Sequence, residues 1–566
     1  MDRLVEVLRE RFGHLEFQPG QREAVAGLLD GRDVLAIMPT GAGKSLTYQL
    51  TGLVLDGATI VVSPLIALMR DQTERLAEMN ISVAEINSTR SAKENEAALA
   101  GLAEGRHKFA LVTPERATDP EFLALLKQIK VALFVVDEAH LISEWGHDFR
   151  PSYLLLRESI AAAGRPPVLA LTATATPIVR EDIVANLRLR DPLVIVRGFD
   201  RPNLYLDVAM MRSEDDKLAA LRAMLGCVKE SETGEEGFVQ SGEDPIRLTG
   251  SGIVYAATIK NVNRVADFLR EHGCHSVIYH GQLKKAERET AQVAFMNNEV
   301  DVVVATTAFG MGIDKPDIRF IVHYDLPGSI EQYYQEIGRA GRDGEPATCV
   351  LLYHHADRQV QNFFIASSMP SETRVRQVWA VLSDIAAKAN TDTLTVADIE
   401  KELSLKRGEI HLLLAPLIDS GHITRPQRGK LHLRSRGVSP EELELDVARF
   451  ERHKAFERSR LQMVEAYAQA RDCRREFILN YFGEQYDTEN CGACDNCRAG
   501  RSYTNTPADT PFSTGSMVRH KQWGIGTVQR LDGDTLTVMF DAAGYKQLSM
   551  EIVTDLGLLM PVEVAA

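Results

Sequence analysis

The chain has 566 residues, of which 45% are hydrophobic and 25% are charged, a balance typical of globular domains and not of disordered chains. At about 150 residues per domain, this length indicates roughly three to four domains. Because 64 Lys and Arg face 79 Asp and Glu, the formal net charge is −15, so any contact with nucleic acid must come from local basic surface. No apolar run reaches about 18 residues, which excludes a transmembrane helix.

From Val34 to Val350, short apolar runs alternate with longer amphipathic stretches, the pattern of buried parallel strands joined by crossover helices. These runs include Val34–Met38, Thr59–Ser63, Phe109–Thr113, Leu133–Asp137, Val168–Thr172, Gly252–Tyr255, Ser276–His280, Val302–Thr306, Phe320–Tyr324 and Thr348–Tyr353. They fall into two sets, and the acidic segment Lys229–Asp244 is interpreted as an exposed insertion near the start of the second. The predicted fold class is therefore α/β, with tandem halves at 1–206 and 207–353.

After Tyr353, the pattern of the sequence changes from alternating strands and helices to mostly helical segments. Helical patterns over Val396–Leu403 and Gly408–Ser420 precede Ile423–Leu433, in which a turn separates two short alternating runs. A helix, a turn, a second helix and a β-ribbon in this order are typical of a winged helix. We therefore expect a helical, winged-helix-like domain at 354–445.

Four of the seven cysteines lie close together in a helical module that we place at 446–500. Cys473 is followed by Cys491, Cys494 and Cys497, whose two overlapping C-x₂-C steps allow tetrahedral thiolate ligation. The spacing predicts one zinc ion with four protein ligands, which is the pattern of a structural site in a reducing compartment. The other cysteines are interpreted as ordinary buried thiols: Cys227, Cys274 and Cys349.

A linker and a small β unit follow the cysteines. Residues 501–516 are rich in Ser, Thr, Pro and Gly, a composition typical of linkers. Within 517–559, alternating runs and glycine turns predict an antiparallel unit, which we interpret as a small β-barrel.

Met38–Ser45 has the pattern of a phosphate-binding loop between a strand and a helix, although the strict motif has Gly in place of Met38. Gly41 and Gly43 free backbone amides for phosphate oxygens. Lys44 can reach the β- and γ-phosphates, and the hydroxyl of the following serine can bind Mg²⁺. For an isolated match, the alternative is an ordinary glycine-rich turn.

Charged residues follow at two further points. The apolar run Val131–Val136 delivers the sequence Asp137–His140 to the end of a strand, where an acid can hold Mg²⁺ and a Glu can polarise water. Arg339 and Arg342 are three residues apart, which would place both guanidinium groups on one side of a helix, as for an arginine finger from a second domain. The alternatives are solvated strand caps and a solvated basic turn.

Taken in order, these motifs resemble those of superfamily 2 helicases and, more narrowly, of the RecQ DNA helicases. The matching stretches are Phe17–Gln21, Met38–Ser45, Ser63–Gln72, Thr113–Arg116, Asp137–His140, Thr172–Thr174, Tyr279–Gly281, Val304–Asp317 and Gln335–Gly344. The cysteine cluster also resembles the RecQ zinc module. The resemblance implies that the two α/β halves are RecA-like helicase domains.

The resemblance also implies roles for individual residues. The nucleotide would be bound by Gln21, Thr40, Gly41, Gly43, Lys44, Ser45 and Asp314. The catalytic set would be Lys44, Asp137, Glu138, Arg339 and Arg342. Within these sets, Gln21 would read the adenine and Asp314 would sense the nucleotide across the cleft. Asp137, with Ser45, would hold Mg²⁺. Glu138 would position the attacking water, and the finger would be Arg342.

A loop with Gly, Pro and aromatic residues follows the acidic motif directly. Loop aromatics such as Trp145 and Phe149 can stack on unpaired bases, and Arg150 can meet phosphate. The alternative is that one of the aromatics packs onto its own domain. By resemblance, this loop would couple single-stranded DNA to ATP hydrolysis, through Trp145, His147, Phe149 and Arg150.

The chain departs from the family pattern in three places. Family members often have Tyr and Arg beside the adenine where this chain has His14 and Gln18. The winged-helix-like segment precedes the zinc cysteines, and its part Gly421–Ser439 holds five basic residues and no acid, which favours a DNA-contacting wing over a solvated ribbon. The unit at 517–559 is similar to Tudor- or SH3-like barrels of some superfamily 1 repair helicases, which implies partner docking, with a stabilising cap as the alternative.

The resemblance implies an ATP-dependent DNA helicase that moves 3′→5′ on single-stranded DNA and unwinds duplexes in repair and recombination. Its cofactors would be ATP, Mg²⁺ and Zn²⁺. Its partners would be single-stranded and branched DNA, and a protein such as a single-stranded-DNA-binding protein on the β unit. We expect a cytoplasmic protein without membrane contact, associated with the nucleoid if bacterial. Two alternatives stay open: an RNA helicase of the same superfamily, and a zinc-stabilised DNA-binding or scaffold protein with a dead ATPase.

Overall fold

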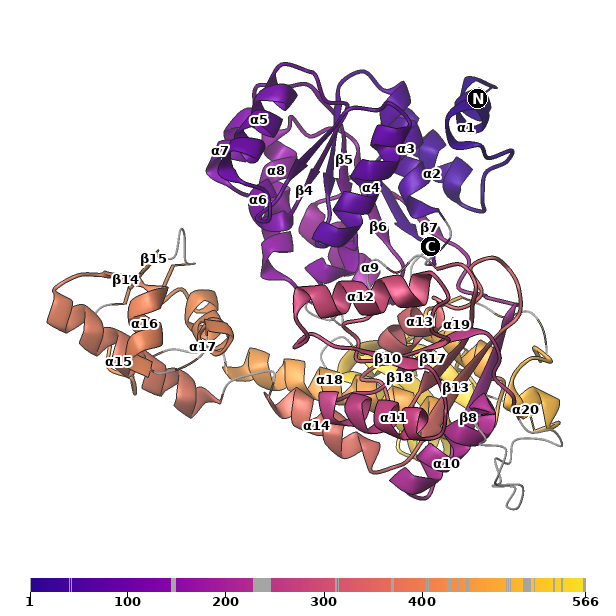
Figure 1. Cartoon of the computed structure of the whole chain (residues 1–566). Coiled ribbons are helices and arrows are strands. Elements are labelled where there is room, and N and C mark those ends of the chain that lie inside the picture. Colours follow the sequence, from indigo (N-terminus) through magenta and orange to yellow (C-terminus); the bar gives the residue numbers. More distant parts are fainter. Residues whose placement is uncertain are drawn as a thin grey trace.

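The computed structural model of the chain (Figure 1) describes residues 2–562 except for 40, 42, 144–148, 227–245, 311, 312, 314, 368–370, 404, 406, 425–429, 436, 444–446, 485, 487, 489, 502–509, 514, 533, 534, 541 and 542. Among these residues, no helix combines the length and the apolar character that a membrane crossing requires.

The first body is built on a seven-stranded parallel sheet with the order β3-β4-β2-β5-β6-β1-β7. Its strands are β1 (Val34–Ile37), β2 (Ala58–Val62), β3 (Val83–Ile86), β4 (Phe109–Val112), β5 (Val131–Val136), β6 (Val168–Thr172) and β7 (Leu193–Val196). Its helices are α1 (Asp2–Phe12), α2 (Gln21–Leu29), α3 (Lys44–Val54), α4 (Ile66–Glu78), α5 (Ala92–Ala103), α6 (Pro114–Ala117), α7 (Pro120–Leu126), η1 (Ala139–Ile142), η2 (Pro151–Leu155), α8 (Leu156–Ala162) and α9 (Pro177–Leu187). Leu35 and Ile37 face one core and Val34 and Ala36 face another, so both sides of the sheet are covered and its strands are apolar throughout.

The second body repeats this arrangement with a six-stranded parallel sheet in the order β10-β11-β9-β12-β13-β8. Its strands are β8 (Leu204–Met210), β9 (Ser251–Tyr255), β10 (Ser276–Tyr279), β11 (Val302–Ala305), β12 (Ile318–His323) and β13 (Ala347–Tyr353). Its helices are α10 (Glu214–Leu225), α11 (Ile259–Glu271), α12 (Lys285–Met296) and α13 (Ile330–Ile337). All ten apolar runs named from the sequence overlap strands of the two sheets, which confirms the prediction of two parallel α/β halves.

A helical unit is inserted between two packed helices, α14 (Asp357–Ser367) and α18 (Val447–Gln469). It comprises α15 (Glu372–Ala389), β14 (Thr393–Thr395), α16 (Val396–Leu403), α17 (Arg407–Asp419) and β15 (Lys430–His432). β14 pairs with β15, and a bridge joins Ile423 to Leu433, so the order of elements agrees with the predicted helix–turn–helix–ribbon pattern. The unit has its own apolar core around Trp379 and stands apart from both sheets (Figure 1).

The remaining elements pack on the second body and on α18. Helices α19 (Arg474–Tyr481) and α20 (Asp495–Arg498) flank the cysteines. A five-stranded antiparallel sheet follows, in the order β19-β18-β17-β16-β20. Its strands are β16 (Met517–His520), β17 (Gly524–Asp532), β18 (Thr535–Phe540), β19 (Gly544–Ser549) and β20 (Leu559–Pro561). Helix α21 (Met550–Asp555) connects β19 to β20. The predicted antiparallel unit is therefore present, while its closure into a barrel stays a prediction.

Candidate functional site

The phosphate-binding loop lies where β1 ends and α3 begins. Gly41 and Gly43 have φ angles of 90° and 66°, in the left-handed region that glycine adopts without steric cost. Lys44, the first residue of α3, donates through Nζ to the carbonyl oxygens of Met38 at 3.1 Å and Pro39 at 3.4 Å. The loop thus holds its ammonium group among backbone carbonyls, at the point where a phosphate chain would lie.

Two acidic side chains lie beside this loop, at the carboxyl end of β5. Asp137 accepts hydrogen bonds from the Ser63 hydroxyl at 3.4 Å and from the backbone N–H of Glu138 at 3.0 Å. Burial and then the charge of Glu138 raise the pKa of Asp137 to about 7, and burial also raises the pKa of Glu138. Burial lowers the pKa of Lys44, although both carboxylates oppose that effect. Each of the three charges is therefore poorly stabilised by its surroundings.

A line of polar contacts runs from the acidic pair to the second body. His140 Nδ1 lies 3.3 Å from Glu138 Oε2 and 2.8 Å from Thr172 Oγ1. Burial lowers the pKa of His140 to about 3, so the imidazole is neutral at ordinary pH. Thr172 Oγ1 donates to the carbonyl of Thr174 at 3.0 Å, and Gln335 Nε2 of α13 donates to Thr174 Oγ1 at 2.9 Å. The acidic motif is thus connected to the helix that precedes the two arginines.

Both predicted arginines of the second body lie on the far side of the same cleft. Arg339 is buried and donates to the carbonyl of Gly310, and Arg342 Nη1 donates to the carbonyl of Ile313 at 3.0 Å. A Cβ atom placed on Gly41 would lie 3.6 Å from Arg342 Cγ, so the Arg342 side chain is next to the phosphate-binding loop. The structure therefore brings together residues that the sequence placed in two separate halves.

The cleft between the bodies has a volume of about 680 Å³, within the range of about 300–1,000 Å³ that is usual for small-molecule sites. Lys44, Asp137 and Arg342 line it. His14 also lines it, and Arg11 and Phe12 at the end of α1 supply a basic and an aromatic side chain nearby. The cleft can therefore enclose a nucleotide with phosphates at one end and a base at the other.

Gln21 begins α2 and contacts the phosphate-binding loop directly. Its Nε2 donates to the carbonyl of Gly43 at 3.1 Å, and its Oε1 accepts from the backbone N–H of Gln18 at 2.9 Å. The described loop residue Arg150 donates to the carbonyl of Pro64 at 3.3 Å and lines the same cleft, while Phe149 is half-buried. Four predicted site residues lie outside the described residues: Thr40, Trp145, His147 and Asp314.

The four predicted metal ligands form a compact cluster whose sulfur atoms all lie within 4.8 Å of one another. With Zn–S bonds of about 2.3 Å, a tetrahedron places its sulfurs about 3.8 Å apart, and Cys491 Sγ and Cys497 Sγ are 3.8 Å apart. Backbone N–H groups of Ala493 and Cys497 donate at 3.4 Å to the sulfurs of Cys491 and Cys494, which favours thiolates. Cys473 completes the set from the N-cap of α19, so the donors fit a closed structural zinc site.

The interpretation of the other cysteines as ordinary thiols holds only in part. Cys349 is a free, buried cysteine in β13. Cys274 is disulfide-bonded, so its interpretation as a thiol is wrong. Cys227 lies outside the described residues. A lone cysteine carries no local signal of its bonding partner, because that partner is chosen by the fold.

Sequence reasoning missed the residues that hold the arginines in place. Arg201, just before β8, donates to the backbone carbonyls of Gly338, Ala340 and Gly341 at 2.8–3.2 Å. These carbonyls belong to the turn that carries Arg342. A single arginine between two strands has no pattern that distinguishes it from a solvated one, so no signal in the sequence could have found it.

The sequence is similar over almost its whole length to two proteins of Bacillus subtilis (strain 168). It is 35% identical over 527 residues to ATP-dependent DNA helicase RecQ, which covers 92% of this chain and 71% of the relative. It is 33% identical over 540 residues to Probable ATP-dependent DNA helicase RecS, which covers 94% of this chain and 100% of that relative. The chain belongs to the RecQ family of ATP-dependent DNA helicases. A third relative of this RecQ-family chain, ATP-dependent DNA helicase RecQ of Pasteurella multocida (strain Pm70), is 42% identical over 353 residues, or 62% of the chain and 52% of the relative.

Family models divide this RecQ-family chain into matched parts. DEAD/DEAH box helicase matches residues 18–183 and helicase conserved C-terminal domain matches 246–344. RecQ zinc-binding matches 441–498, which confirms that the four cysteines form a zinc-binding module. Residues 512–556 match a protein of unknown function (DUF3553), so the family models give the antiparallel unit no role.

Proposed function

We propose that this RecQ-family chain hydrolyses ATP to move 3′→5′ along single-stranded DNA and to unwind duplexes in repair and recombination. The observation that carries the proposal is the convergence of Lys44, Asp137 and Arg342 from two separate sheets on one cleft. A site that is complete only when two bodies meet can couple hydrolysis to their relative motion. The polarity and the role in repair rest on the family resemblance.

In this proposal, each charged group has a task that its position allows. Lys44 would exchange its two backbone carbonyl partners for the β- and γ-phosphates of ATP. Glu138, whose Oε2 lies 3.3 Å from the neutral His140 ring, would orient the attacking water. Arg342 would act as the finger that stabilises charge developing on the transferred phosphoryl group.

The donor set beside the phosphate-binding loop fits a magnesium ion. Asp137 offers a buried carboxylate, Ser45 offers a hydroxyl in the same cleft, and hard oxygen donors are those that Mg²⁺ prefers. Burial and the neighbouring Glu138 raise the pKa of Asp137 to about 7, so a cation would relieve an electrostatic deficit there. When bound, Mg²⁺ would neutralise charge on the β- and γ-phosphates.

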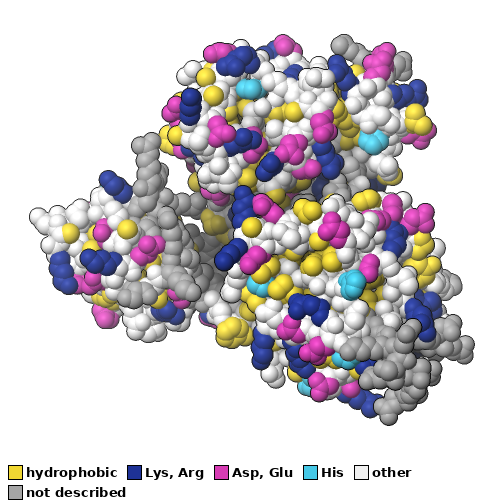
Figure 2. All heavy atoms as spheres, in the orientation of Figure 1, with side chains coloured by type: hydrophobic (Ala, Val, Ile, Leu, Met, Phe, Trp, Pro, Cys, Tyr) yellow, Lys and Arg dark blue, Asp and Glu magenta, His cyan; other side chains and the backbone are white. Residues whose placement is uncertain are grey.

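DNA would be engaged at two places, the loop after the acidic motif and the ribbon of the inserted unit. Arg150 lines the cleft, and Lys430 on β15 is exposed. Figure 2 shows Lys and Arg side chains interspersed with Asp and Glu on both bodies, so local basic segments must supply the phosphate contacts. The ribbon would wedge the duplex with the basic residues Arg425, Arg428, Lys430, Arg434 and Arg436, of which Arg425, Arg428 and Arg436 lie outside the described residues.

A strand-displacement assay tests the proposal. Wild type and Lys44→Ala would be compared on duplexes with 3′ or 5′ single-stranded tails, with Lys388→Ala, an exposed lysine of the inserted unit, as the matched control. We expect ATP-dependent unwinding of 3′-tailed DNA only, loss of unwinding and ATPase in Lys44→Ala, and normal activity in the control. Unwinding by Lys44→Ala would contradict the site, and unwinding of 5′-tailed duplexes alone would contradict the polarity.

ATPase assays with DNA or RNA single strands separate the two alternative functions. RNA single strands that stimulate the ATPase as strongly as DNA would favour an RNA helicase. A chain that binds DNA and retains zinc but has no ATPase would be a scaffold, although the assembled cleft argues against it.

A further inference from the structure

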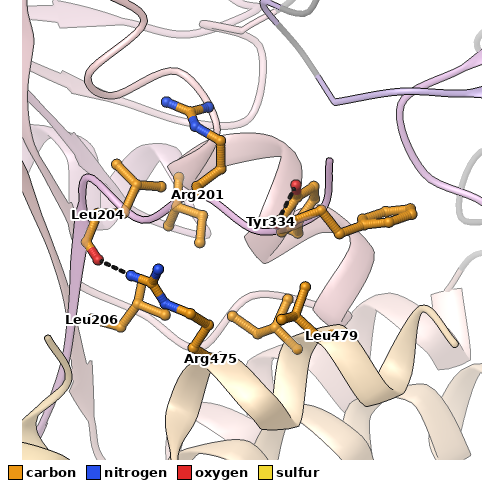
Figure 3. A pocket seen from close by; sticks show the side chains of 9 residues that line it. Arg201, Leu204, Leu206, Tyr334, Arg475 and Leu479 are labelled. Atoms are coloured by element: carbon orange, nitrogen blue, oxygen red, sulfur yellow. Dashed lines mark hydrogen bonds between the residues drawn. The ribbon is translucent and has the colours of Figure 1, made fainter. Parts of the chain in front are cut away.

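Helix α13 connects the ATP cleft with the zinc-binding module. Gln332, Gln335 and Glu336 on this helix line the cleft, and Arg339 follows the helix directly. On its other side, Tyr334 donates to the carbonyl of Phe199 at 3.0 Å, close to α19. Figure 3 shows Tyr334 in the same junction as Arg475 of α19, whose guanidinium donates to the Leu204 carbonyl at 2.9 Å. The cavity among these groups measures about 20 Å³, room for little more than a water molecule, so the junction is packed and offers no ligand site.

The N-terminus of α13 is held by one buried arginine of α18. Ser329 caps α13, with its hydroxyl accepting from the backbone N–H of Gln332 at 3.1 Å. Arg460 Nη2 donates to the same Ser329 hydroxyl at 3.0 Å and lies 3.2 Å from Glu331 Oε2 in the first turn. Arg460 is 1% exposed and Glu331 is 5% exposed, so water does not loosen this ion pair. At 1.5 Å per residue, the eight residues of α13 span about 12 Å, so a shift at this end is carried to the arginines at the other.

The C-terminal unit packs onto the same turn of α18. The backbone N–H of Tyr545, in β19, donates to the Ser459 hydroxyl at 3.1 Å, and Ser459 precedes Arg460. The Tyr545 ring stacks on Tyr481 of α19, with ring centres 5.1 Å apart, and is 2% exposed. Burial and then the Glu331 carboxylate raise the pKa of Tyr545 well above its usual value.

A second contact fixes the C-terminal unit to α19, the helix that begins just after the zinc ligand Cys473. Arg530 of β17 forms an ion pair with Asp472, next to the ligand Cys473, and its guanidinium lies 4.7 Å from the centre of the Phe477 ring. Arg530 is 7% exposed. The C-terminal unit is therefore bound to both α18 and α19, and not merely tethered to them.

We propose that the C-terminal unit positions the arginine finger: by packing on Ser459 and Tyr481, it fixes Arg460 against Ser329 and Glu331, and so sets where α13 presents Arg339 and Arg342 to the cleft. This role rests on the proposed finger function of Arg342. It assigns the DUF3553-matching unit to the motor itself, as a brace whose loss slows turnover without removing a group that touches ATP.

The test uses two glycines of the unit that have the same strain but different surroundings. Gly544 (φ +69°) begins β19, and a Cβ there would lie 2.4 Å from Ser459 Oγ and 3.1 Å from Phe456. Gly524 (φ +78°) begins β17, and a Cβ there would meet nothing within 4 Å. Gly544→Ala and Gly524→Ala in the full chain therefore carry similar backbone strain, but only Gly544→Ala introduces a clash with Ser459 and Phe456 of α18. Tyr545→Ala and Tyr545→Phe form a second pair, in which Phe keeps the stacked ring.

We expect Gly544→Ala and Tyr545→Ala to lower kcat of the DNA-stimulated ATPase at least about fivefold, since a misplacement of about 1 Å can cost about 10²-fold. KM for ATP should stay within about twofold, because the groups that bind the nucleotide are untouched. Gly524→Ala and Tyr545→Phe should behave as wild type. Without nucleotide or DNA, hydrogen exchange at the amides of α13 should rise in Gly544→Ala and not in Gly524→Ala.

Zinc content and thermal unfolding are measured for each variant as controls. A wild-type kcat in Gly544→Ala would overturn the proposal, and so would a loss of kcat that appears only together with zinc loss or unfolding at the assay temperature. Arg342→Ala is measured in the same series. If Arg342→Ala is fully active, the finger function fails; if it is impaired while Gly544→Ala is normal, only the positioning role fails.

Discussion

The cleft between the two bodies and the junction of α13, α18, α19 and α20 both bury charged side chains, but they differ in how these charges are stabilised. In the cleft, the Lys44 ammonium contacts backbone carbonyls, and burial raises the pKa of Asp137 to about 7. In the junction, Arg474 donates to both carboxylate oxygens of Asp495 at 2.8 and 3.0 Å, and both residues are almost fully buried.

This difference distinguishes two roles of buried charge. In the cleft, a bound ligand can stabilise the charges, whereas in the junction the charges already stabilise one arrangement of the helices. Charges that are poorly stabilised in the free protein gain most when phosphates and a cation arrive, which is typical of catalytic sites. A fully paired charge gains nothing from a ligand, but it fixes one relative position of the helices that carry it. Removing a charge from the cleft should therefore impair turnover without destabilising the free protein, whereas breaking a charge pair in the junction should destabilise it.

The largest effect should come from the zinc ligands in the junction. Cys494→Ser removes one buried thiolate, and because the binding free energy of structural zinc, about 10–16 kcal/mol in small zinc modules, is folding free energy, the module should unfold first. Metal analysis and urea unfolding would measure this change, with Cys349→Ala as a control that should retain the metal. A zinc-free but equally stable Cys494→Ser protein would show that the cluster does not hold the module together.

In the cleft, Arg342→Ala should slow ATP hydrolysis by about 10³-fold or more while ATP binding survives, because a finger contacts the transition state more strongly than the ground state. Steady-state kinetics would give kcat and KM, and thermal unfolding should give an unchanged midpoint. A lowered affinity with a normal kcat would place Arg342 in nucleotide binding instead.

Breaking the buried pair of the junction should lower stability by several kcal/mol. Arg474→Met leaves Asp495 buried without its partner, and such losses cost about 3–5 kcal/mol. Urea unfolding would measure the loss, and the double variant Arg474→Met/Asp495→Asn should recover part of it, because no unpaired charge remains. Equal stability of the single and double variants would mean that the charge of Asp495 is satisfied elsewhere.

A cleft substitution should instead stabilise the free protein. The pKa of Asp137 is about 7 in the folded chain against 3.8 as its ordinary value, so the folded state holds an extra proton between these values. The protonated Asp137 side chain therefore contributes to the stability of the folded state at low pH, and this contribution is lost as pH rises through about 7. The Asn side chain of Asp137→Asn has no proton to lose in this range. At about 1.4 kcal/mol per pKa unit, the free energy of unfolding of this variant should exceed that of wild type by up to about 4 kcal/mol at about pH 8.

Thermal unfolding of the nucleotide-free proteins between about pH 5.5 and 8 checks the sign of this effect. The advantage of Asp137→Asn over wild type should grow with pH, while its ATPase is lost. A constant difference across this range would show that Asp137 stays ionised in the folded state.

The smallest effect should come from the ribbon, which belongs to neither region. Replacing Arg425, Arg428 and Lys430 with Ala should weaken binding to forked duplexes and flatten its salt dependence by about one unit of slope for each phosphate that is no longer neutralised. ATPase stimulated by single strands should remain. Binding measured over a salt series would test this, and an unchanged slope would assign duplex binding to another surface.

The elements of the two sheets and the cysteine cluster could be predicted from the sequence because their signals are local. Val34–Ile37 is apolar throughout because both faces of its sheet are covered, and the phosphate-binding loop follows it directly. The spacing of Cys491, Cys494 and Cys497 alone indicates a tetrahedral metal site. Each of these features depends on residues close in sequence, so the order of letters is enough to find them.

The coupling between these parts is visible only once the chain is folded. Arg460 on α18 and Arg201 before β8 look like ordinary surface arginines in the sequence, since burial of a paired charge leaves no periodic trace. The sequence of the C-terminal unit is compatible with partner docking and with a stabilising cap, whereas the fold buries Tyr545 against Ser459. The reason is physical: a strand or a loop forms from its own residues, whereas a buried contact between distant segments exists only after the whole chain has packed.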